Sequence, residues 1–217
     1  MNVLVFAPHN DDEVLGVGGT IAKHVDNGDS VYVCEVTVWK ENQVEANRIK
    51  NEAIMAHKVL GVKDSIFLDL PVVGLKETPT VEKNEAFRKV VNDLNPEIVY
   101  LPHVGDMHID HYETALAAMT ALRPISNPNL NAIYVYETLS ETEWNIPNIA
   151  NAFKANVYSD ITNYIDIKLE AMKCYKSQLC DFPHPRSLQA IKAQSMLRGS
   201  TVGVNFAEAF YLVRYIF

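Results

Sequence analysis

The chain has 217 residues, of which 48% are hydrophobic and 21% are charged, and this composition is typical of a soluble globular protein. Its length fits one domain with a full core, which we expect to cover residues 1–217. The 27 acidic and 19 basic side chains give a net charge of −8, which disfavours nucleic acid or an anionic membrane as the main partner.

Targeting and redox signals in the sequence favour a cytoplasmic protein. No window of about 18 apolar residues exists, so we expect no transmembrane helix. The first predicted strand begins at Asn2 or Val3 without a basic segment before it, so we expect no signal peptide. The three cysteines are scattered and odd in number, which predicts reduced thiols.

The predicted elements alternate between strands and helices from the start of the chain. An apolar strand over residues 3–7 leads into a helix that ends near Asn27-Gly28. The elements that follow are a buried strand over 30–38, an amphipathic helix over 43–60, a short strand over 65–68, a helix over 81–94 and a strand over 97–102. This alternation predicts βαβ units and a parallel sheet, and therefore the α/β fold class.

The second half of the chain is less regular. The elements expected there are a helix over 112–122, a strand over 132–136, a helix over 164–180 and a helix over 188–198. Residues 207–217 are apolar, and we expect them to pack against the domain or against a neighbouring subunit.

A group of ionisable residues follows the first strand, in the run Pro8-His9-Asn10-Asp11-Asp12-Glu13. Sites in open α/β sheets are built at the carboxyl ends of the strands. His9 and Asp12 offer a nitrogen and an oxygen ligand three residues apart, which suits a divalent metal ion, and Asp11 remains available as a base. An acidic helix N-terminus would account for the carboxylates alone, but it does not need a histidine three residues earlier.

The run Gly16-Val17-Gly18-Gly19 lies within the helix that follows this group. A dinucleotide-binding motif places its glycines in the turn between strand and helix, so the run is a weak match to it. We expect instead that the glycines allow the helix to pack closely on its neighbours.

A second polar group, within residues 103–111, follows the strand over 97–102 and therefore lies on the same expected rim of the sheet. His108 and His111 are three residues apart, with Asp110 between them. Metal-bound histidines usually donate their other ring N–H to a carboxylate, and Asp110 could accept it. A set of surface histidines at a helix start is the alternative, but the first group on the same rim favours a metal site.

Other charged residues are candidates for binding a substrate. Arg48 either forms an exposed helix ion pair with Glu52 or reaches the mouth of the site and binds hydroxyl or carboxylate groups. Arg186 and Arg198 are either ligands for an anionic group or solvated charges. Glu208 lies in an apolar run, needs a partner if it is buried, and is a further candidate site residue.

The two motifs together resemble the signatures of the LmbE-like, or PIG-L, family of zinc-dependent de-N-acetylases. Pro8-His9-Asn10-Asp11-Asp12-Glu13 resembles the (A/P)HxDDE motif, and His108-Ile109-Asp110-His111 resembles the HxDH motif. The similarity extends over almost the whole chain. It implies a Rossmann-like, three-layer α/β domain with a mostly parallel sheet and a site at the carboxyl ends of the strands.

The resemblance also implies a role for each motif residue. It implies a Zn2+ ligand set of His9, Asp12 and His111. Asp11 would be the general base, His108 would stabilise the oxyanion or protonate the leaving group, and Asp110 would orient a histidine. Two positions depart from the family pattern, because Asn10 stands where proline is commonest and Asp106 stands where some members have tyrosine.

The chemistry is consistent with these residue types. Two histidines and one aspartate leave zinc an open position for water, whose pKa the ion lowers toward neutrality. Asp11 takes the proton, the hydroxide attacks the acetyl carbonyl, and zinc with the His108 imidazolium stabilises the oxyanion.

The leading hypothesis is therefore a zinc-dependent N-deacetylase acting on a small N-acetylated amino sugar or its conjugate. The alternatives are a zinc amidase that cleaves a non-sugar amide and a non-catalytic Rossmann-like module that binds a sugar or nucleotide. The family resemblance and the apolar C-terminal segment also predict a homo-oligomer, either a trimer or a hexamer.

Overall fold

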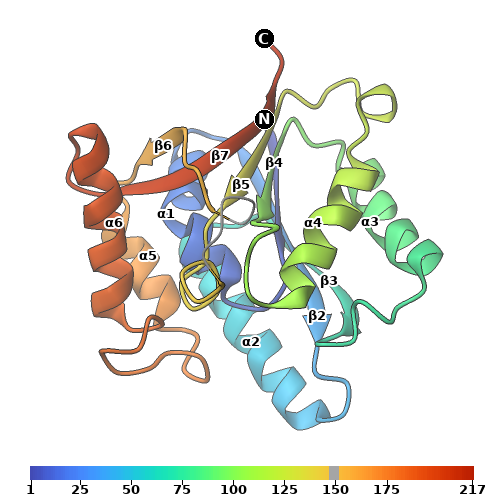
Figure 1. Ribbon diagram of the computed structural model, residues 1–217, viewed down its shortest axis with the longest axis horizontal. Helices are drawn as coiled ribbons and strands as arrows, with labels where there is room; N and C mark the ends of the chain where they lie inside the picture. The colour runs from blue at the N-terminus through green and yellow to red at the C-terminus, as the bar shows by residue number, and fades with distance from the viewer. Residues whose placement is uncertain (147–151) are drawn as a thin grey trace.

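The protein is built on one mixed β-sheet. The computed structural model describes residues 1–146 and 152–217, and the seven strands among these residues pair in the order β3-β2-β1-β4-β5-β7-β6 (Figure 1). The strands are β1 (Asn2–Ala7), β2 (Ser30–Val38), β3 (Asp64–Pro71), β4 (Ile98–Pro102), β5 (Ala132–Tyr136), β6 (Val157–Asp160) and β7 (Ala207–Tyr215). The helices are α1 (Asp12–Asp26), α2 (Gln43–Leu60), α3 (Thr80–Leu94), α4 (Ile109–Ala121), the short 3-10 helix η1 (Pro124–Ser126), α5 (Ile165–Met172) and α6 (Leu188–Val202).

The strand order places the carboxyl ends of β1 and β4 side by side. β1 pairs in parallel with β2 on one side and with β4 on the other. β3 and β5 continue the parallel set, whereas β7 is antiparallel to both β5 and β6. The direction of strand addition reverses between β1 and β4, and ligands of open α/β sheets bind at such a switch point. Both polar groups of the sequence follow these two strands.

Helices cover both faces of the sheet and produce three layers (Figure 1). Alternate residues of β1 enter two separate cores, as the period of two along a strand requires. Val3, Val5 and Ala7 pack in the core beneath α1, α2 and α5, while Leu4 and Phe6 pack beneath α3 and α4. Burial on both faces explains why β1 is apolar from Val3 to Ala7. The predicted α/β class with a mostly parallel sheet is confirmed, and among the described strands only β7 runs opposite to the others.

The glycines of α1 allow close packing, as predicted. A Cβ atom at Gly16 would overlap the ring of Tyr136, and one at Gly19 would come within 2.8 Å of Ile161. The glycines lie inside α1 and not in the turn that precedes it. They therefore serve helix packing.

The chain departs from the predicted elements where tertiary contacts decide the backbone. The helix predicted over 164–180 ends at Met172, because the chain turns there and buries Tyr175 with its hydroxyl on Glu13. Helix α4 starts at Ile109 and not at residue 112, because the His108 ring caps it by accepting the backbone N–H of Asp110.

The C-terminal part of the sheet was only partly predicted. Strand β6 has four residues and pairs only with β7 among the described strands, so its pattern is too short to recognise. The apolar segment 207–217 forms β7, which lies between β5 and β6 and thus packs within the same sheet.

The structure also bears on the membrane and redox expectations. In the described part of the chain, no helix combines the length and apolarity needed to cross a bilayer. Cys34, Cys174 and Cys180 are all free thiols.

Candidate active site

The turn between β1 and α1 holds Asp11 in a strained backbone conformation. Its φ angle is +129°, in a region that residues with a side chain rarely adopt, and only 1% of the residue is exposed. Neighbouring groups fix the turn: Thr37 Oγ1 donates to the Pro8 carbonyl at 2.7 Å, and the Asp11 N–H donates to Glu13 Oε2 at 3.1 Å. Strain of this kind persists where the surroundings enforce it, and it concentrates at functional sites.

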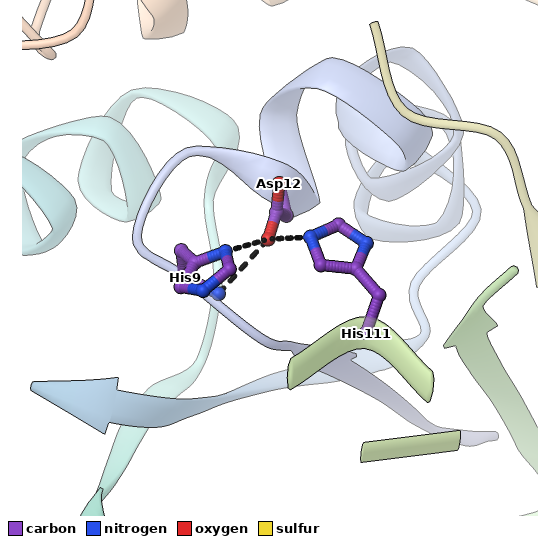
Figure 2. A group of neighbouring side chains, drawn as sticks. All are labelled: His9, Asp12 and His111. Atoms are coloured by element: carbon purple, nitrogen blue, oxygen red, sulfur yellow. Dashed lines mark hydrogen bonds and ion pairs between the residues drawn. The ribbon is translucent and has the colours of Figure 1, made fainter. Parts of the chain in front are cut away.

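The three predicted metal ligands, His9, Asp12 and His111, converge at this turn. His9 Nδ1 and His111 Nε2 lie 3.2 Å and 3.1 Å from the same oxygen, Oδ2 of Asp12 (Figure 2). His111 Nε2 and Asp12 Oδ1 are buried and have no hydrogen-bond partner among the described residues. Buried polar atoms without partners are costly unless a ligand satisfies them. The donor set therefore fits a divalent cation bound by two nitrogens and one oxygen.

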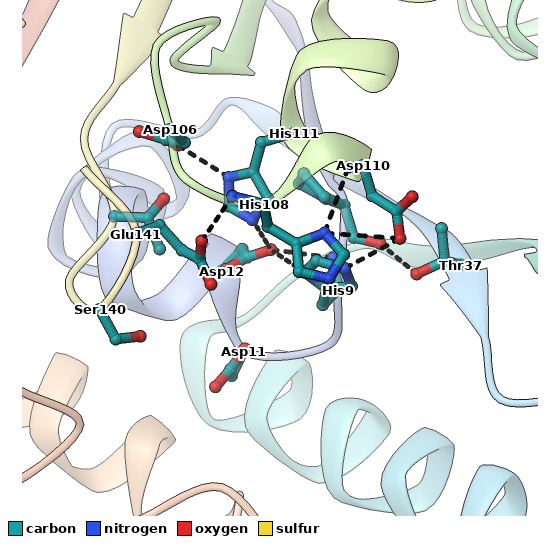
Figure 3. Close-up of polar contacts among 12 residues, drawn as sticks. His9, Asp11, Asp12, Thr37, Asp106, His108, Asp110, His111, Ser140 and Glu141 are labelled. Carbon is teal, nitrogen blue, oxygen red and sulfur yellow. Dashed lines mark hydrogen bonds and ion pairs between the residues drawn. The ribbon is translucent and has the colours of Figure 1, made fainter. Parts of the chain in front are cut away.

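In His9 and in His111, the second ring nitrogen contacts a carboxylate (Figure 3). Asp110 Oδ2 lies 3.3 Å from His9 Nε2 and also accepts the Val73 N–H at 2.7 Å. Asp106 Oδ2 lies 2.8 Å from His111 Nδ1. Such partners orient the ring and increase its basicity as a ligand. The sequence analysis assigned an orienting role only to Asp110 and missed Asp106. The one feature that could have indicated this role is the position of Asp106 within the second polar group.

The electrostatics of the three donors favour a positive charge among them. Burial alone would lower the pKa of His9, but its contacts with Asp110 and Asp12 raise that pKa to about 9. Burial would raise the pKa of the Asp12 carboxyl, yet His111 and His9 hold it well below its usual range. A bound cation would meet the same demand for positive charge.

Asp11 stands apart from the three donors (Figure 3). It faces the guanidinium of Arg186. Arg186 Nε lies 3.6 Å from Asp11 Oδ2, and Ser140 Oγ and Gln178 Oε1 hold the guanidinium in place at 3.0 Å and 3.1 Å. Burial raises the pKa of the Asp11 carboxyl to about 7, while Arg186 opposes that shift. A carboxylate that titrates near neutrality is well suited to accept and return a proton. From the sequence alone, Arg186 was either a ligand for an anionic group or a solvated charge.

His108 is neutral and has one tautomer fixed by the fold. Its Nδ1 accepts the Asp110 N–H at 3.2 Å, so the proton of the neutral ring resides on Nε2. Burial and the neighbouring His9 lower the pKa of His108 to about 4. This lowered pKa disfavours the imidazolium expected from the sequence and leaves Nε2–H as an uncharged donor.

A pocket of about 430 Å³ opens over these groups, a size typical of small-molecule sites. Its lining combines the catalytic candidates with apolar side chains of β2 and α2. The lining residues are His9, Asn10, Asp11, Thr37, Val38, Trp39, Glu45, Ala46, Ile49, Val72, His108, Glu141, Ser177, Gln178 and Arg186.

Comparison with known proteins identifies the family. The family model described as PIG-L, GlcNAc-PI de-N-acetylase, matches residues 4–122, which is more than half of the chain. The protein belongs to the PIG-L family. Both polar groups, at residues 8–13 and 103–111, lie within the matched segment of this PIG-L protein.

Individual relatives resemble this PIG-L protein along most of its length. A diacetylchitobiose deacetylase from Thermococcus kodakarensis is 28% identical over 99% of this chain and 84% of its own length. A probable N-acetyl-alpha-D-glucosaminyl L-malate deacetylase 2 from Bacillus anthracis is 30% identical over 82% of this chain and 81% of its own. The crystal structure of a conserved protein from Thermus thermophilus, TT1542, superposes with a TM-score of 0.82 at 26% identity and covers 99% and 96% of the two chains.

Arg48 lies beside the pocket of the PIG-L domain but not in its lining. Its guanidinium forms an ion pair with Glu45 on the same helix, and 54% of its side chain is exposed. Glu52, the partner expected from the sequence, instead accepts the backbone N–H of Ser177. The predicted Arg48–Glu52 pair is therefore wrong, and the described pocket takes its guanidinium from Arg186.

Glu208 has the buried partner that its sequence environment demanded, but that partner lies away from the pocket. Its carboxylate accepts Lys168 Nζ at 2.6 Å and the backbone N–H groups of Gly19 and Thr20 at 2.9 Å and 2.8 Å. All of these contacts are on the body of α1 or on α5 beside it. This placement assigns Glu208 a structural role in place of the substrate-binding role expected from the sequence.

Glu208→Ala is expected to lower the free energy of unfolding by about 3–5 kcal/mol, because it leaves the buried Lys168 ammonium without its partner. Urea denaturation of the folded variant measures this loss, while KM stays at the parent value. Glu170→Ala is the matched control, since Glu170 pairs with Lys173 on the exposed surface and such pairs contribute about 1 kcal/mol or less. Equal losses in the two variants, or a raised KM for Glu208→Ala alone, would contradict the assignment.

Proposed function

We propose that this PIG-L protein is a zinc-dependent hydrolase that removes the N-acetyl group from an N-acetylated amino sugar or its conjugate. One observation carries the proposal: the three converging donors, His9, Asp12 and His111, share one site with the buried carboxyl of Asp11 and the N–H of His108. The names of the relatives, a diacetylchitobiose deacetylase and a probable N-acetylglucosaminyl-malate deacetylase, support the sugar-amide class.

His9, Asp12 and His111 would hold the ion, which when bound supplies Lewis acidity and lowers the pKa of a water molecule toward neutrality. Asp11 accepts a proton from the attacking water molecule as the oxygen of that water forms a bond to the acetyl carbon. The Asp11 carboxyl then returns that proton to the amine nitrogen as the C–N bond breaks. The products are a free amino sugar and acetic acid, which ionises to acetate in solution, and the carboxylate of Asp11 is restored.

The neutral His108 ring stabilises the charge that develops on the carbonyl oxygen. Its Nδ1 is occupied by the Asp110 N–H, so Nε2–H is the donor that remains for the substrate. A donor held in place before the reaction stabilises an oxyanion more effectively than one that must reorganise. Glu141 accepts the backbone N–H of His108 at 3.0 Å and thus helps to keep the residue in position.

Release of a free amine from a panel of acetamides tests this function. We expect turnover of N-acetylglucosamine, di-N-acetylchitobiose and an N-acetylglucosaminyl conjugate, and none of acetylated lysine peptides. Turnover of peptides alone would favour the zinc amidase. Binding of sugars or nucleotides without any amine release would favour the non-catalytic module.

Arg186→Gln is expected to move the acidic limb of the kcat/KM profile to higher pH. The Arg186 guanidinium favours the ionised form of Asp11, so its removal raises the Asp11 pKa further above the ordinary aspartate value. Since Asp11 accepts a proton only when ionised, activity exists above this pKa and is lost as the pH falls through it. Arg198→Gln is the control, because Arg198 is paired with Glu137 outside the pocket lining. An unmoved limb, or one displaced to lower pH, would contradict the role of Arg186.

We further propose that copies of the chain associate as a trimer or hexamer in the cytoplasm. The family resemblance supports this, as do exposed apolar side chains toward the end of β7, namely Tyr211, Val213 and Tyr215. Light scattering should give a mass of three or six chains, and a monomer at high protein concentration would overturn the proposal.

A further inference from the structure

A buried polar cluster lies behind the turn that carries Asp11. Its side chains come from four different parts of the chain, and at most 2% of each residue is exposed. The members are Glu13 on α1, Glu35 on β2, His57 on α2 and Tyr175 after α5. Polar and ionisable side chains are seldom buried so completely unless they are paired, and none of the four takes part in the proposed reaction.

The Glu13 carboxylate connects this cluster to the catalytic turn. Its Oε2 accepts the backbone N–H of Asp11 at 3.1 Å. Its Oε1 accepts the Tyr175 hydroxyl at 2.5 Å and lies 3.4 Å from His57 Nε2. One oxygen of Glu13 thus holds the strained residue, and the other is held by Tyr175 and His57.

We propose that Tyr175 and His57 are positioning residues for Asp11 that act through the carboxylate of Glu13. The inference rests on the proposed function, because it assigns these residues to the placement of the general base. The φ angle of +129° at Asp11 is strained for a residue with a side chain and persists only if surrounding contacts enforce it. The contact of the Asp11 N–H with Glu13 is one of those contacts.

His57 has the charge and the orientation that this role requires. Burial alone would lower its pKa, but the contacts with Glu13 and Glu35 raise that pKa to about 9, so the ring is cationic at neutral pH. A cation between two buried carboxyl groups offsets the cost of burying them. Its Nδ1 lies 2.7 Å from Ser65 Oγ, which fixes the ring so that Nε2 faces Glu13 and Glu35.

A second metal ion is the competing explanation, because Glu13, Glu35 and His57 offer three converging ligand atoms. The observations favour positioning. Tyr175 already donates to one Glu13 oxygen and Asp11 to the other, and His57 Nε2 lies 3.4 Å from Glu13 Oε1 and 3.2 Å from Glu35 Oε1. The metal content of the Tyr175→Phe and His57→Gln variants distinguishes the two explanations.

Tyr175→Phe is the first test, since it removes one hydroxyl and little else. We expect kcat to fall about 10- to 100-fold, the scale of a misplaced catalytic group, with KM within about twofold and the metal content unchanged. Tyr136→Phe is the matched control: Tyr136 is equally buried, and its hydroxyl donates to the Phe6 carbonyl at 2.8 Å without contact to Glu13. His57→Gln should reproduce the effect of Tyr175→Phe.

The same change in the Asp11→Asn background provides the decisive comparison. If Tyr175 acts through Asp11, Tyr175→Phe should produce no further fall in kcat once Asp11 can no longer accept a proton. An unchanged kcat for Tyr175→Phe in the parent enzyme, equal falls for Tyr136→Phe and Tyr175→Phe, or additive losses in the double variant would overturn the proposal. Loss of a metal equivalent from His57→Gln would also overturn it, in favour of the second metal. A silent Asp11→Asn variant would instead refute the proposed function itself.

Discussion

Asp11→Asn is expected to lower kcat by about 10²–10⁴-fold while the protein retains its full complement of metal. The substitution keeps the size of the side chain, but the amide cannot accept a proton at neutral pH. His9, Asp12 and His111 supply the donor set without Asp11, so metal content measured on the purified variant should match the parent. KM should change little, because the other side chains of the pocket remain in place.

The pH profile of Asp11→Asn gives a second readout of the same prediction. Because burial raises the pKa of the Asp11 carboxyl to about 7, its titration should produce the acidic limb of the parent profile. That limb should be absent from the residual activity of the variant.

A purely structural role for Asp11 makes the opposite prediction. Asparagine caps a helix about as well as aspartate, so an acidic helix N-terminus would make the substitution nearly silent. The structure shows no capping hydrogen bond from the Asp11 side chain, and both carboxylate oxygens are buried without hydrogen-bond partners among the described residues. A variant with full metal and at least half of the parent activity would refute the general-base assignment.

The location of the site was predictable from the sequence, because local patterns determine it. The strands β1 and β4 are apolar runs of the kind buried in parallel sheets, and each is followed directly by histidines and aspartates. Strands alternating with helices must place their carboxyl ends on one rim, so the two motifs were expected to meet. The contacts of His9 with Asp12 and Asp110 follow from that topology.

Contacts between distant parts of the chain were not predictable in the same way. Tyr175 and Glu13 are 162 residues apart, and the sequence around Tyr175 fits a continuous helix. The turn that ends α5 becomes favourable only when the Tyr175 hydroxyl finds the buried Glu13 carboxylate, which is a tertiary interaction. The same holds for Arg186, whose guanidinium reaches Asp11 only through the packing of the segment that precedes α6.

Glu208 illustrates an intermediate case. An acidic residue in an apolar run predicts a buried partner, but the pattern does not say whether that partner is a substrate or the protein itself. The structure identifies Lys168, 40 residues earlier, together with two backbone N–H groups of α1. Local sequence thus predicted the need for a partner but not its identity.

His9→Ala is expected to abolish both metal binding and turnover while the fold persists. The substitution removes one of three converging donors, and the side chain borders the pocket with 18% of its surface exposed, so its loss leaves the two cores beneath the site intact. Added Zn2+ should restore a chelator-treated parent enzyme to full activity but should leave His9→Ala inactive.

The orienting carboxylates should show a graded effect. Asp106→Asn keeps all three donors but weakens the contact that fixes His111, and losses of this kind lower metal affinity by about 10- to 100-fold. Its activity should therefore recover at high Zn2+ concentration, which distinguishes an orienting residue from a ligand.

His24→Ala is the matched control for both variants. His24 also pairs with a carboxylate, since its Nδ1 lies 2.7 Å from Asp29 Oδ2. Its other ring nitrogen contacts the Tyr100 hydroxyl. His24 belongs to none of the groups of described residues that could hold a metal ion. It should retain metal and activity at parent levels. If His9→Ala, Asp12→Ala and His111→Ala all retain stoichiometric metal, or if His24→Ala loses metal to the same extent as they do, the ligand assignment is wrong.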